Sequence, residues 1–189
     1  MSSAFVLGIR QGVEALRQGG VIAYPTEGVW GLGCDPADYP ALQRILDLKQ
    51  RPVAKGVILL GSRLEQLAPW LGSLSRDEWN RLAQSRGKGV SWLVPHEGNT
   101  PWWITGDQPN VAVRLTDHPV VCDLCDGFGG AIVSTSANPG GMAPALNALR
   151  VRSYFGNLIE VIVPGALGGQ NGPSEIRTLR GDAVIRPGK

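Results

Sequence analysis

Long apolar runs are absent from this sequence of 189 residues. The longest, such as residues 57–60, have the length of a strand, whereas a membrane-spanning helix needs about 18 or more apolar residues in succession. The N-terminus also lacks a basic segment followed by an uninterrupted apolar stretch, so no signal peptide is visible. We therefore expect a cytoplasmic protein that does not enter a membrane.

Cysteine and histidine are scarce, with three of the first and two of the second. An odd number of cysteines argues against a disulfide framework. The pair Cys122 and Cys125 has C-x-x-C spacing, which is typical of redox pairs and of half a zinc site, but it falls late in a predicted helix instead of after a strand. His96 and His118 have no partner at metal-ligand spacing, and His118 is expected in a turn. We expect ordinary helix cysteines and no tightly bound metal.

The standard nucleotide-binding loops are also missing. The sequence contains no G-x-x-x-x-G-K-[ST] and no G-x-G-x-x-G that opens a helix after a strand. The net charge of +2 is too small to indicate a nucleic-acid-binding domain by itself. Apolar residues make up 43% of the chain, which excludes a disordered protein, because such a chain lacks the apolar surface that offsets conformational entropy.

Glycine, proline and arginine are abundant instead. The 26 glycines and 14 prolines exceed the usual share of both residues and predict many tight turns. Arginine supplies 14 of the 18 cations, and its guanidinium is a planar fork of donors that fits a carboxylate or a phosphate. Genomic base composition is an equally good explanation of the arginine excess.

The spacing of apolar residues predicts five helices and nine strands. The helices are expected at 4–18, 40–49, 75–84, 119–126 and 145–155, and the strands at 21–24, 29–34, 57–60, 90–94, 111–115, 131–134, 159–163, 175–179 and 183–186. Several strands follow one another without a helix between them, which favours a mixed sheet over a purely parallel one. We expect an α/β fold, α+β by some schemes, with one domain over residues 1–189 built on an open twisted sheet flanked by helices.

Small polar and cationic residues gather at predicted strand ends. The segment STSAN at 134–138 follows a strand, where open sheets bind ligands, although an ordinary turn gives the same pattern. Arg114 and Arg186 alternate with aliphatic residues inside strands, and Arg51 follows a helix. Three such cations in one small sheet indicate a shared anion such as a polyphosphate, and separate surface ion pairs are the alternative.

Six motifs resemble one known family when they are read in order. They are YPTEGVWGLGCD at 24–35, KQRP at 49–52, VR at 113–114, STSAN at 134–138, PSEIR at 173–177 and IRPG at 185–188. Each motif is weak by itself, but together they resemble the TsaC/YrdC family of threonylcarbamoyl-AMP synthases in its short bacterial form. The resemblance implies a YrdC-like fold.

The resemblance also implies a reaction. L-threonine, bicarbonate and ATP, with Mg²⁺ carried by ATP, give threonylcarbamoyl-AMP and pyrophosphate. A downstream tRNA threonylcarbamoyl transferase complex then uses the product to modify an adenosine of tRNA. Such chemistry needs positioning and charge neutralisation more than a covalent nucleophile, which agrees with a chain that has no candidate triad.

Residue roles follow from the resemblance position by position. The catalytic phosphate clamp is Lys49 and Arg51, and the other ATP contacts are Ser136, Asn138 and Arg186. The threonine site consists of Arg114 for the carboxylate together with Thr26, Gly28, Lys55, Ser134 and Ser174. Many relatives have threonine at the position of Gly28, and longer relatives often have histidine at that of Lys55. Glu27 lies in the same loop, and the sequence gives it no role.

Two other functions are alternatives to this synthase reaction. A module that binds double-stranded RNA or tRNA without catalysis would use the same arginines, but no aromatic and basic motif of a known RNA-binding domain is present. A carbamoyl-transfer subdomain like that of hydrogenase maturation proteins is disfavoured, because no zinc-finger or acylphosphatase segment accompanies it.

Overall fold

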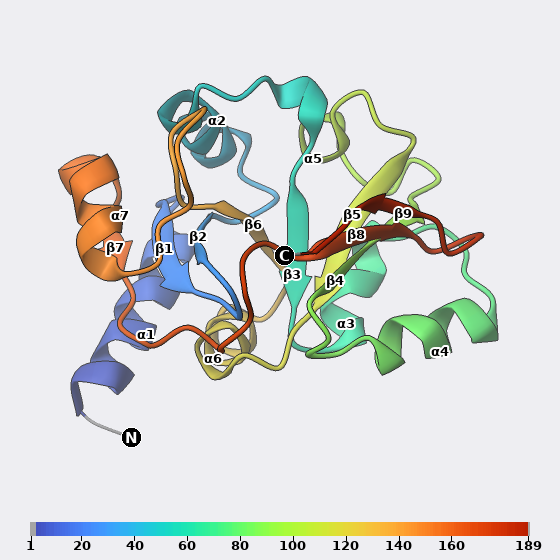
Figure 1. Cartoon of the computed structure of the whole chain (residues 1–189), viewed down its shortest axis with the longest axis horizontal. Coiled ribbons are helices and arrows are strands. Elements are labelled where there is room, and N and C mark those ends of the chain that lie inside the picture. Colours follow the sequence, from blue (N-terminus) through green and yellow to red (C-terminus); the bar gives the residue numbers. More distant parts are fainter. Residues whose placement is uncertain (1–2, 189) are drawn as a thin grey trace.

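A mixed β-sheet forms the centre of the computed structural model, which describes residues 3–188 (Figure 1). Its strands are β1 (Ile22–Pro25), β2 (Trp30–Gly33), β3 (Ile58–Gly61), β4 (Val90–Pro95), β5 (Asn110–Leu115), β6 (Ile132–Ser136), β7 (Val161–Ile162), β8 (Glu175–Thr178) and β9 (Val184–Arg186). Their order across the sheet is β7-β1-β2-β6-β3-β5-β4-β8-β9. The β1–β7, β3–β5 and β4–β8 pairs are parallel and the others antiparallel. The predicted mixed sheet is thus confirmed.

Helices cover both faces of this sheet. They are α1 (Ser3–Arg17), α2 (Tyr39–Lys49), α3 (Leu64–Leu67), α4 (Arg76–Gln84), α5 (Trp102–Thr105), α6 (Pro119–Phe128) and α7 (Ala148–Phe155). Alternate residues of β1 point to opposite faces: Ile22 packs in an apolar cluster with residues of α1 and α6, and Ala23 packs in a second cluster with residues of α2. Because helices cover both faces at this strand, β1 is apolar on both sides.

The predicted helix signals are confirmed at two N-termini. The Asp38 carboxylate accepts a hydrogen bond from Ala41 N at 2.9 Å and caps α2. Ser75 and Glu78 form the reciprocal capping box that begins α4. Both bonds satisfy amide groups that have no partner within a first helical turn.

Three local predictions are wrong. The helix expected from 145 begins only at 148, because Ala145 N donates to Ala137 O and holds that segment extended. The predicted loop around residues 102–103 contains the short helix α5, which packs both tryptophans against Tyr39. Strand β6 continues to Ser136 and therefore includes part of the segment that was expected to follow it.

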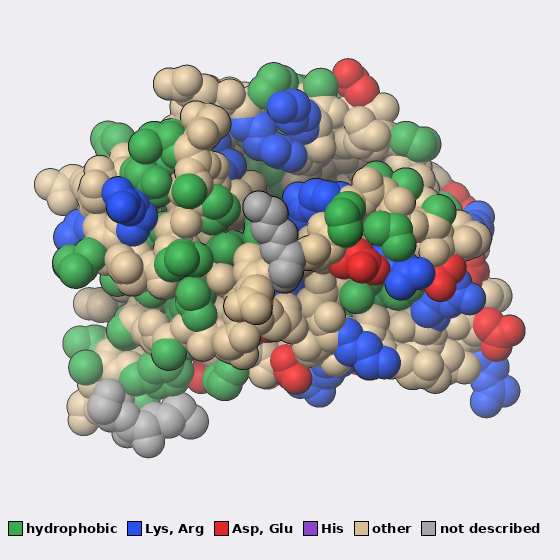
Figure 2. Space-filling model, in the orientation of Figure 1, with side chains coloured by type: hydrophobic (Ala, Val, Ile, Leu, Met, Phe, Trp, Pro, Cys, Tyr) green, Lys and Arg blue, Asp and Glu red, His purple; other side chains and the backbone are tan. Residues whose placement is uncertain are grey.

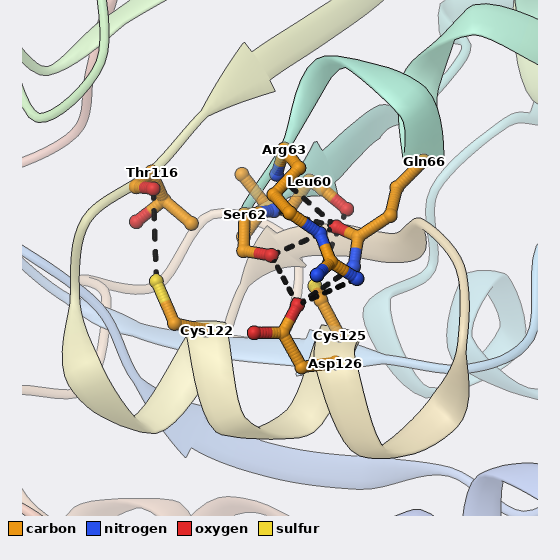
Figure 3. A network of polar contacts seen from close by, with 8 residues as sticks. All are labelled: Leu60, Ser62, Arg63, Gln66, Thr116, Cys122, Cys125 and Asp126. Atoms are coloured by element: carbon orange, nitrogen blue, oxygen red, sulfur yellow. Dashed lines mark hydrogen bonds and ion pairs between the residues drawn. The ribbon is translucent and has the colours of Figure 1, made fainter.

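Cys122 and Cys125 lie on α6 as free thiols (Figure 3). The Sγ of Cys125 lies 3.6 Å from the Leu60 carbonyl oxygen, and that of Cys122 lies 3.7 Å from the Thr116 carbonyl oxygen. Burial raises the pKa of both thiols, which disfavours the reactive thiolate. Next to them, Asp126 accepts hydrogen bonds from Ser62 and Gln66 and joins α6 to α3.

His118 lies in the connection between β5 and α6, directly before the first residue of the helix. It is buried, and its Nε2 lies 3.1 Å from the Ala166 carbonyl oxygen.

Within residues 3–188, no helix combines the length and the apolar character that crossing a bilayer requires.

Candidate active site

A cavity of about 280 Å³ lies over the middle of the sheet, where residues from β2, β3, β5, β6, β8 and β9 face one another. It brings together most of the side chains that the sequence nominated: Thr26, Arg51, Lys55, Arg114, Ser134, Ser136, Ser174 and Arg186. Three nominated residues do not line it, namely Gly28, Lys49 and Asn138. In the view of Figure 2, basic side chains gather in the upper middle of the molecule, while acidic side chains lie mostly toward the β8–β9 side.

Two arginines form an unpaired cationic end of this cavity. The end of α2 turns at Gln50, whose backbone is left-handed (φ 50°), and so directs Arg51 away from the helix. Arg51 Nη2 donates to the Gly56 carbonyl oxygen at 2.9 Å, and Arg186 Nη2 donates to that of Ser174 at 2.7 Å. Burial lowers the pKa of Arg51, and the positive charge of Arg186 lowers it further.

No carboxylate of the described residues pairs with either arginine. In addition, Arg51 Nε is buried without a hydrogen-bond partner in the described part of the chain. Cations that repel one another and keep a free donor favour an anionic ligand. We call Arg51 and Arg186 the cationic end.

Lys49 lies behind the wall of the cationic end. Its ammonium group donates to the carbonyl oxygens of Ser136 and Asn138, the second at 2.8 Å. Burial lowers the pKa of Lys49 to about 8, and the charge of Arg51 acts in the same direction. Asn138 is held in turn, since its Oδ1 accepts from Ser136 Oγ at 2.6 Å and its Nδ2 donates to the Met142 carbonyl oxygen at 2.8 Å. Lys49 and Asn138 thus shape the turn that follows β6.

Arg114 forms the opposite, paired end with Glu27. Arg114 sits on the central strand β5, is 7% exposed, and lines the cavity together with Asn110 and Ala112 of the same strand. Its Nη2 lies 2.7 Å from Glu27 Oε2, and Glu27 Oε1 accepts a hydrogen bond from Thr116 Oγ1 at 2.6 Å. Sequence reasoning gave Glu27 no role, although its position beside Thr26 in the P-T-E-G loop marked the segment.

The paired arginine still has one donor without a partner. Arg114 Nη2 is paired with Glu27, whereas Nε is buried without an acceptor in residues 3–188. A guanidinium has five N–H donors and binds a carboxylate through two parallel hydrogen bonds. Because Arg114 lines the cavity, a carboxylate there would meet a guanidinium that Glu27 holds on one side.

Residues 164–174, which we call the strap, cross the β1–β2 loop and close one side of the cavity. The strap amides donate to this loop, Gly168 N to Thr26 O at 3.1 Å and Gln170 N to Glu27 O at 2.9 Å. A Cβ atom on Gly28 would overlap the Gly172 carbonyl oxygen, so this close approach requires glycine. A threonine at this position would displace the strap.

The donor set does not fit a resident divalent metal. No carboxylate, histidine or cysteine lines the cavity, and residues 3–188 contain no group of three such side chains that could hold a metal ion. Mg²⁺ prefers carboxylate and phosphate oxygens. A magnesium ion in this cavity would therefore depend on the oxygens of its ligand.

Comparisons with known proteins identify the family of the chain. The family model of Sua5, YciO and YrdC proteins, described as telomere recombination, matches residues 14–188. The chain is 50% identical over 179 residues to the threonylcarbamoyl-AMP synthase of Cellvibrio japonicus, covering 95% of each sequence.

Two solved structures extend the comparison. P. abyssi Sua5 complexed with L-threonine has a TM-score of 0.89 at 28% identity, and the match covers 95% of this chain and 54% of that one. T. kodakarensis HypF has a TM-score of 0.78 at 17% identity, covering 96% of this chain and 24% of that one, which is a likeness of fold alone. The extent of the family match and the identity to its members lead to one conclusion: the chain belongs to the Sua5/YciO/YrdC family.

Proposed function

We propose that this chain is a threonylcarbamoyl-AMP synthase, which joins L-threonine, bicarbonate and ATP and releases pyrophosphate. The observation that carries the proposal is one cavity with two chemically different ends, the cationic end of Arg51 and Arg186 and the paired end of Arg114 and Glu27. The name shared by relatives near 50% identity supports the same activity.

The cationic end suits the phosphates of ATP. In the proposed reaction the threonine amine bonds to the carbon of bicarbonate and loses a proton, water leaves, and a carbamate forms. A carbamate oxygen then attacks the α-phosphorus of ATP, the bond from that phosphorus to the bridging oxygen breaks, and pyrophosphate leaves. Negative charge moves onto the leaving group, and we assign its stabilisation to Arg51 and Arg186 of the cationic end. Mg²⁺ enters this scheme with ATP, as part of the substrate.

The paired end suits threonine. The guanidinium of Arg114 matches an amino-acid carboxylate, and the hydroxyl-bearing residues Thr26, Ser134 and Ser174 line the same cavity. Selection of threonine over valine requires a hydrogen-bond partner for its hydroxyl group, because a purely apolar pocket discriminates weakly between isosteres. We assign that contact to the serine hydroxyls.

The chemistry of the product, threonylcarbamoyl-AMP, indicates which protein partner to expect. A carbamoyl-adenylate is an activated group donor, so a transferase that acts on tRNA must consume it. We expect this step to take place in the cytoplasm together with tRNA modification. The alternative, double-stranded RNA or tRNA binding without catalysis, predicts affinity that falls steeply as salt rises, because counterions compete for phosphate contacts.

Purified protein tests the proposal directly. It is incubated with ATP, Mg²⁺, bicarbonate and L-threonine, and pyrophosphate release is followed with each component omitted in turn. We expect release only in the complete mixture. Release that persists without threonine and bicarbonate would contradict the proposed reaction.

A further inference from the structure

Glu27 is a buried carboxylate that the proposed reaction leaves without a task. It lies in the loop between β1 and β2, and only 4% of its surface is exposed. It does not line the cavity, so it acts on a ligand there only through its neighbours. A charge in such a place is costly unless it is paired and hydrogen-bonded. The identity of its partners therefore shows what it does.

Both carboxylate oxygens of Glu27 are held. Oε2 is 2.7 Å from Arg114 Nη2, and Oε1 accepts from Thr116 Oγ1 at 2.6 Å. Thr116 is fully buried, and its hydroxyl oxygen also accepts a hydrogen bond from His118 N at 3.1 Å. The main chain of Glu27 is held as well, because its carbonyl oxygen accepts from Gln170 N of the strap. A carboxylate fixed at this many points fixes the guanidinium beside it.

The pair also changes the charge of its end of the cavity. Glu27 balances Arg114, whereas no described carboxylate balances Arg51 or Arg186. A zwitterionic amino acid carries no net charge, and a phosphate carries at least one negative charge. The unbalanced arginines therefore attract phosphates more strongly than Arg114 does. This difference directs phosphates to Arg51 and Arg186 and leaves the amino-acid carboxylate to Arg114.

We propose that Glu27 is the positioning residue of Arg114. It holds the guanidinium in position for the amino-acid carboxylate and cancels the guanidinium charge, so that this end of the cavity selects an amino acid over a phosphate. The inference rests on the proposed function, since it takes threonine as the ligand of Arg114.

The variant Glu27→Gln tests it. Glutamine keeps the size of the side chain and the oxygen that accepts from Thr116, but it removes the negative charge. We expect the KM for L-threonine to rise tenfold or more while the KM for ATP stays within twofold. We also expect inorganic phosphate to compete with threonine, with an inhibition constant at least fivefold lower than in the wild type. Product is followed by chromatography, because added phosphate disturbs coupled assays.

A matched control is the same substitution at an exposed ion pair. Glu160 lies 2.6 Å from Arg44, and both side chains are about two-fifths exposed or more. Glu160→Gln should change neither KM nor phosphate inhibition by more than twofold. An equal rise of both KM values in Glu27→Gln would show a merely structural role and overturn the proposal. No change in threonine KM or in phosphate inhibition would also overturn it.

Calorimetric binding of L-threonine without ATP separates this inference from the proposed function. If the wild type binds threonine but releases no pyrophosphate, the proposed function fails, and weaker binding by Glu27→Gln still supports the positioning role. Equal binding by both proteins overturns that role, and absence of binding by the wild type overturns both. If Glu27→Gln does not fold, Thr116→Val releases Oε1 and leaves the ion pair with Arg114 in place, although it also removes the acceptor of His118 N. We expect threonine binding to weaken about threefold, and unchanged binding overturns the inference.

Discussion

Both ends of the cavity contain arginine, but only one end has a carboxylate that neutralises the arginine charge. Arg51 and Arg186 at the cationic end are bonded only to carbonyl oxygens, and no described carboxylate pairs with them. Arg114 at the paired end has Glu27 2.7 Å away. The number of arginines in a sequence therefore does not reveal what each arginine binds. The presence or absence of a buried counter-charge decides which ligand each arginine accepts.

The position of each arginine in the sheet explains the difference. Arg114 lies on β5, between β3 and β4, and a cation on a covered central strand needs a partner because it has lost water. Arg186 lies on the edge strand β9 and is exposed, and Arg51 follows the end of α2. Solvent screens the charges of Arg51 and Arg186 until a ligand displaces the water around them.

Arg114→Met should have the largest effect, because it leaves Glu27 buried without its cation. Removal of one partner of a buried pair costs about 3–5 kcal/mol. We expect the free energy of unfolding, measured with urea, to fall by about that amount, and threonine-dependent pyrophosphate release to disappear. A loss below about 1 kcal/mol would mean that the pair is not buried in solution.

The double variant Arg114→Met/Glu27→Gln sharpens this test. Without either charge, the buried site is neutral, and most of the lost stability should return. Threonine turnover should remain absent, since the carboxylate fork is gone. Recovery of turnover would remove Arg114 from the threonine site.

Arg51→Ala should come next and should act on ATP instead of on stability. By analogy with removal of one oxyanion donor, kcat/KM for ATP should fall about 10²–10³-fold. The free energy of unfolding should change by less than about 1 kcal/mol, because no buried carboxylate loses its partner. Near-normal kinetics would exclude the phosphate role.

Lys49 should give the smallest effect, which depends on pH. The pKa of Lys49 is about 8 in the folded protein and 10.5 in an unfolded chain, so between these values only the unfolded state holds the proton. Stability contributed by this group therefore rises with pH across that window, by about 2 kcal/mol from pH 8 to pH 10.

The measurement is the difference in unfolding free energy between the wild type and Lys49→Met at each pH. The difference is needed because burial raises the pKa of Cys34, Cys125 and Tyr24, which makes the total stability fall with pH in the same range. A difference that stays flat from pH 8 to pH 10 would mean that the ammonium of Lys49 is solvated.

The elements were predictable from sequence where local rules decide them. Alternation and apolar spacing located all nine strands, and the side chains of Asp38 and Ser75 marked two helix starts. The predictions failed where distant contacts decide: Ala137 holds Ala145 extended, and Tyr39 packs against the tryptophans of α5.

The candidate site divides in the same way. The motifs predicted Arg51, Arg114 and Arg186 as site residues, and all three line the cavity. The role of Glu27 was beyond sequence reasoning, because its partner Arg114 lies 87 positions away on β5. Lys49 was predicted to clamp phosphate, yet its bonds go to carbonyl oxygens of the turn after β6, a contact that only the folded chain reveals.

The division of the cavity is tested most directly by calorimetric binding of each substrate alone to two variants, Arg51→Ala and Arg114→Met/Glu27→Gln. A divided cavity predicts a crossed pattern. Arg51→Ala should bind L-threonine as the wild type does and MgATP at least tenfold more weakly, and the double variant should do the reverse. If either variant loses both ligands, or keeps both, the two ends do not bind different substrates.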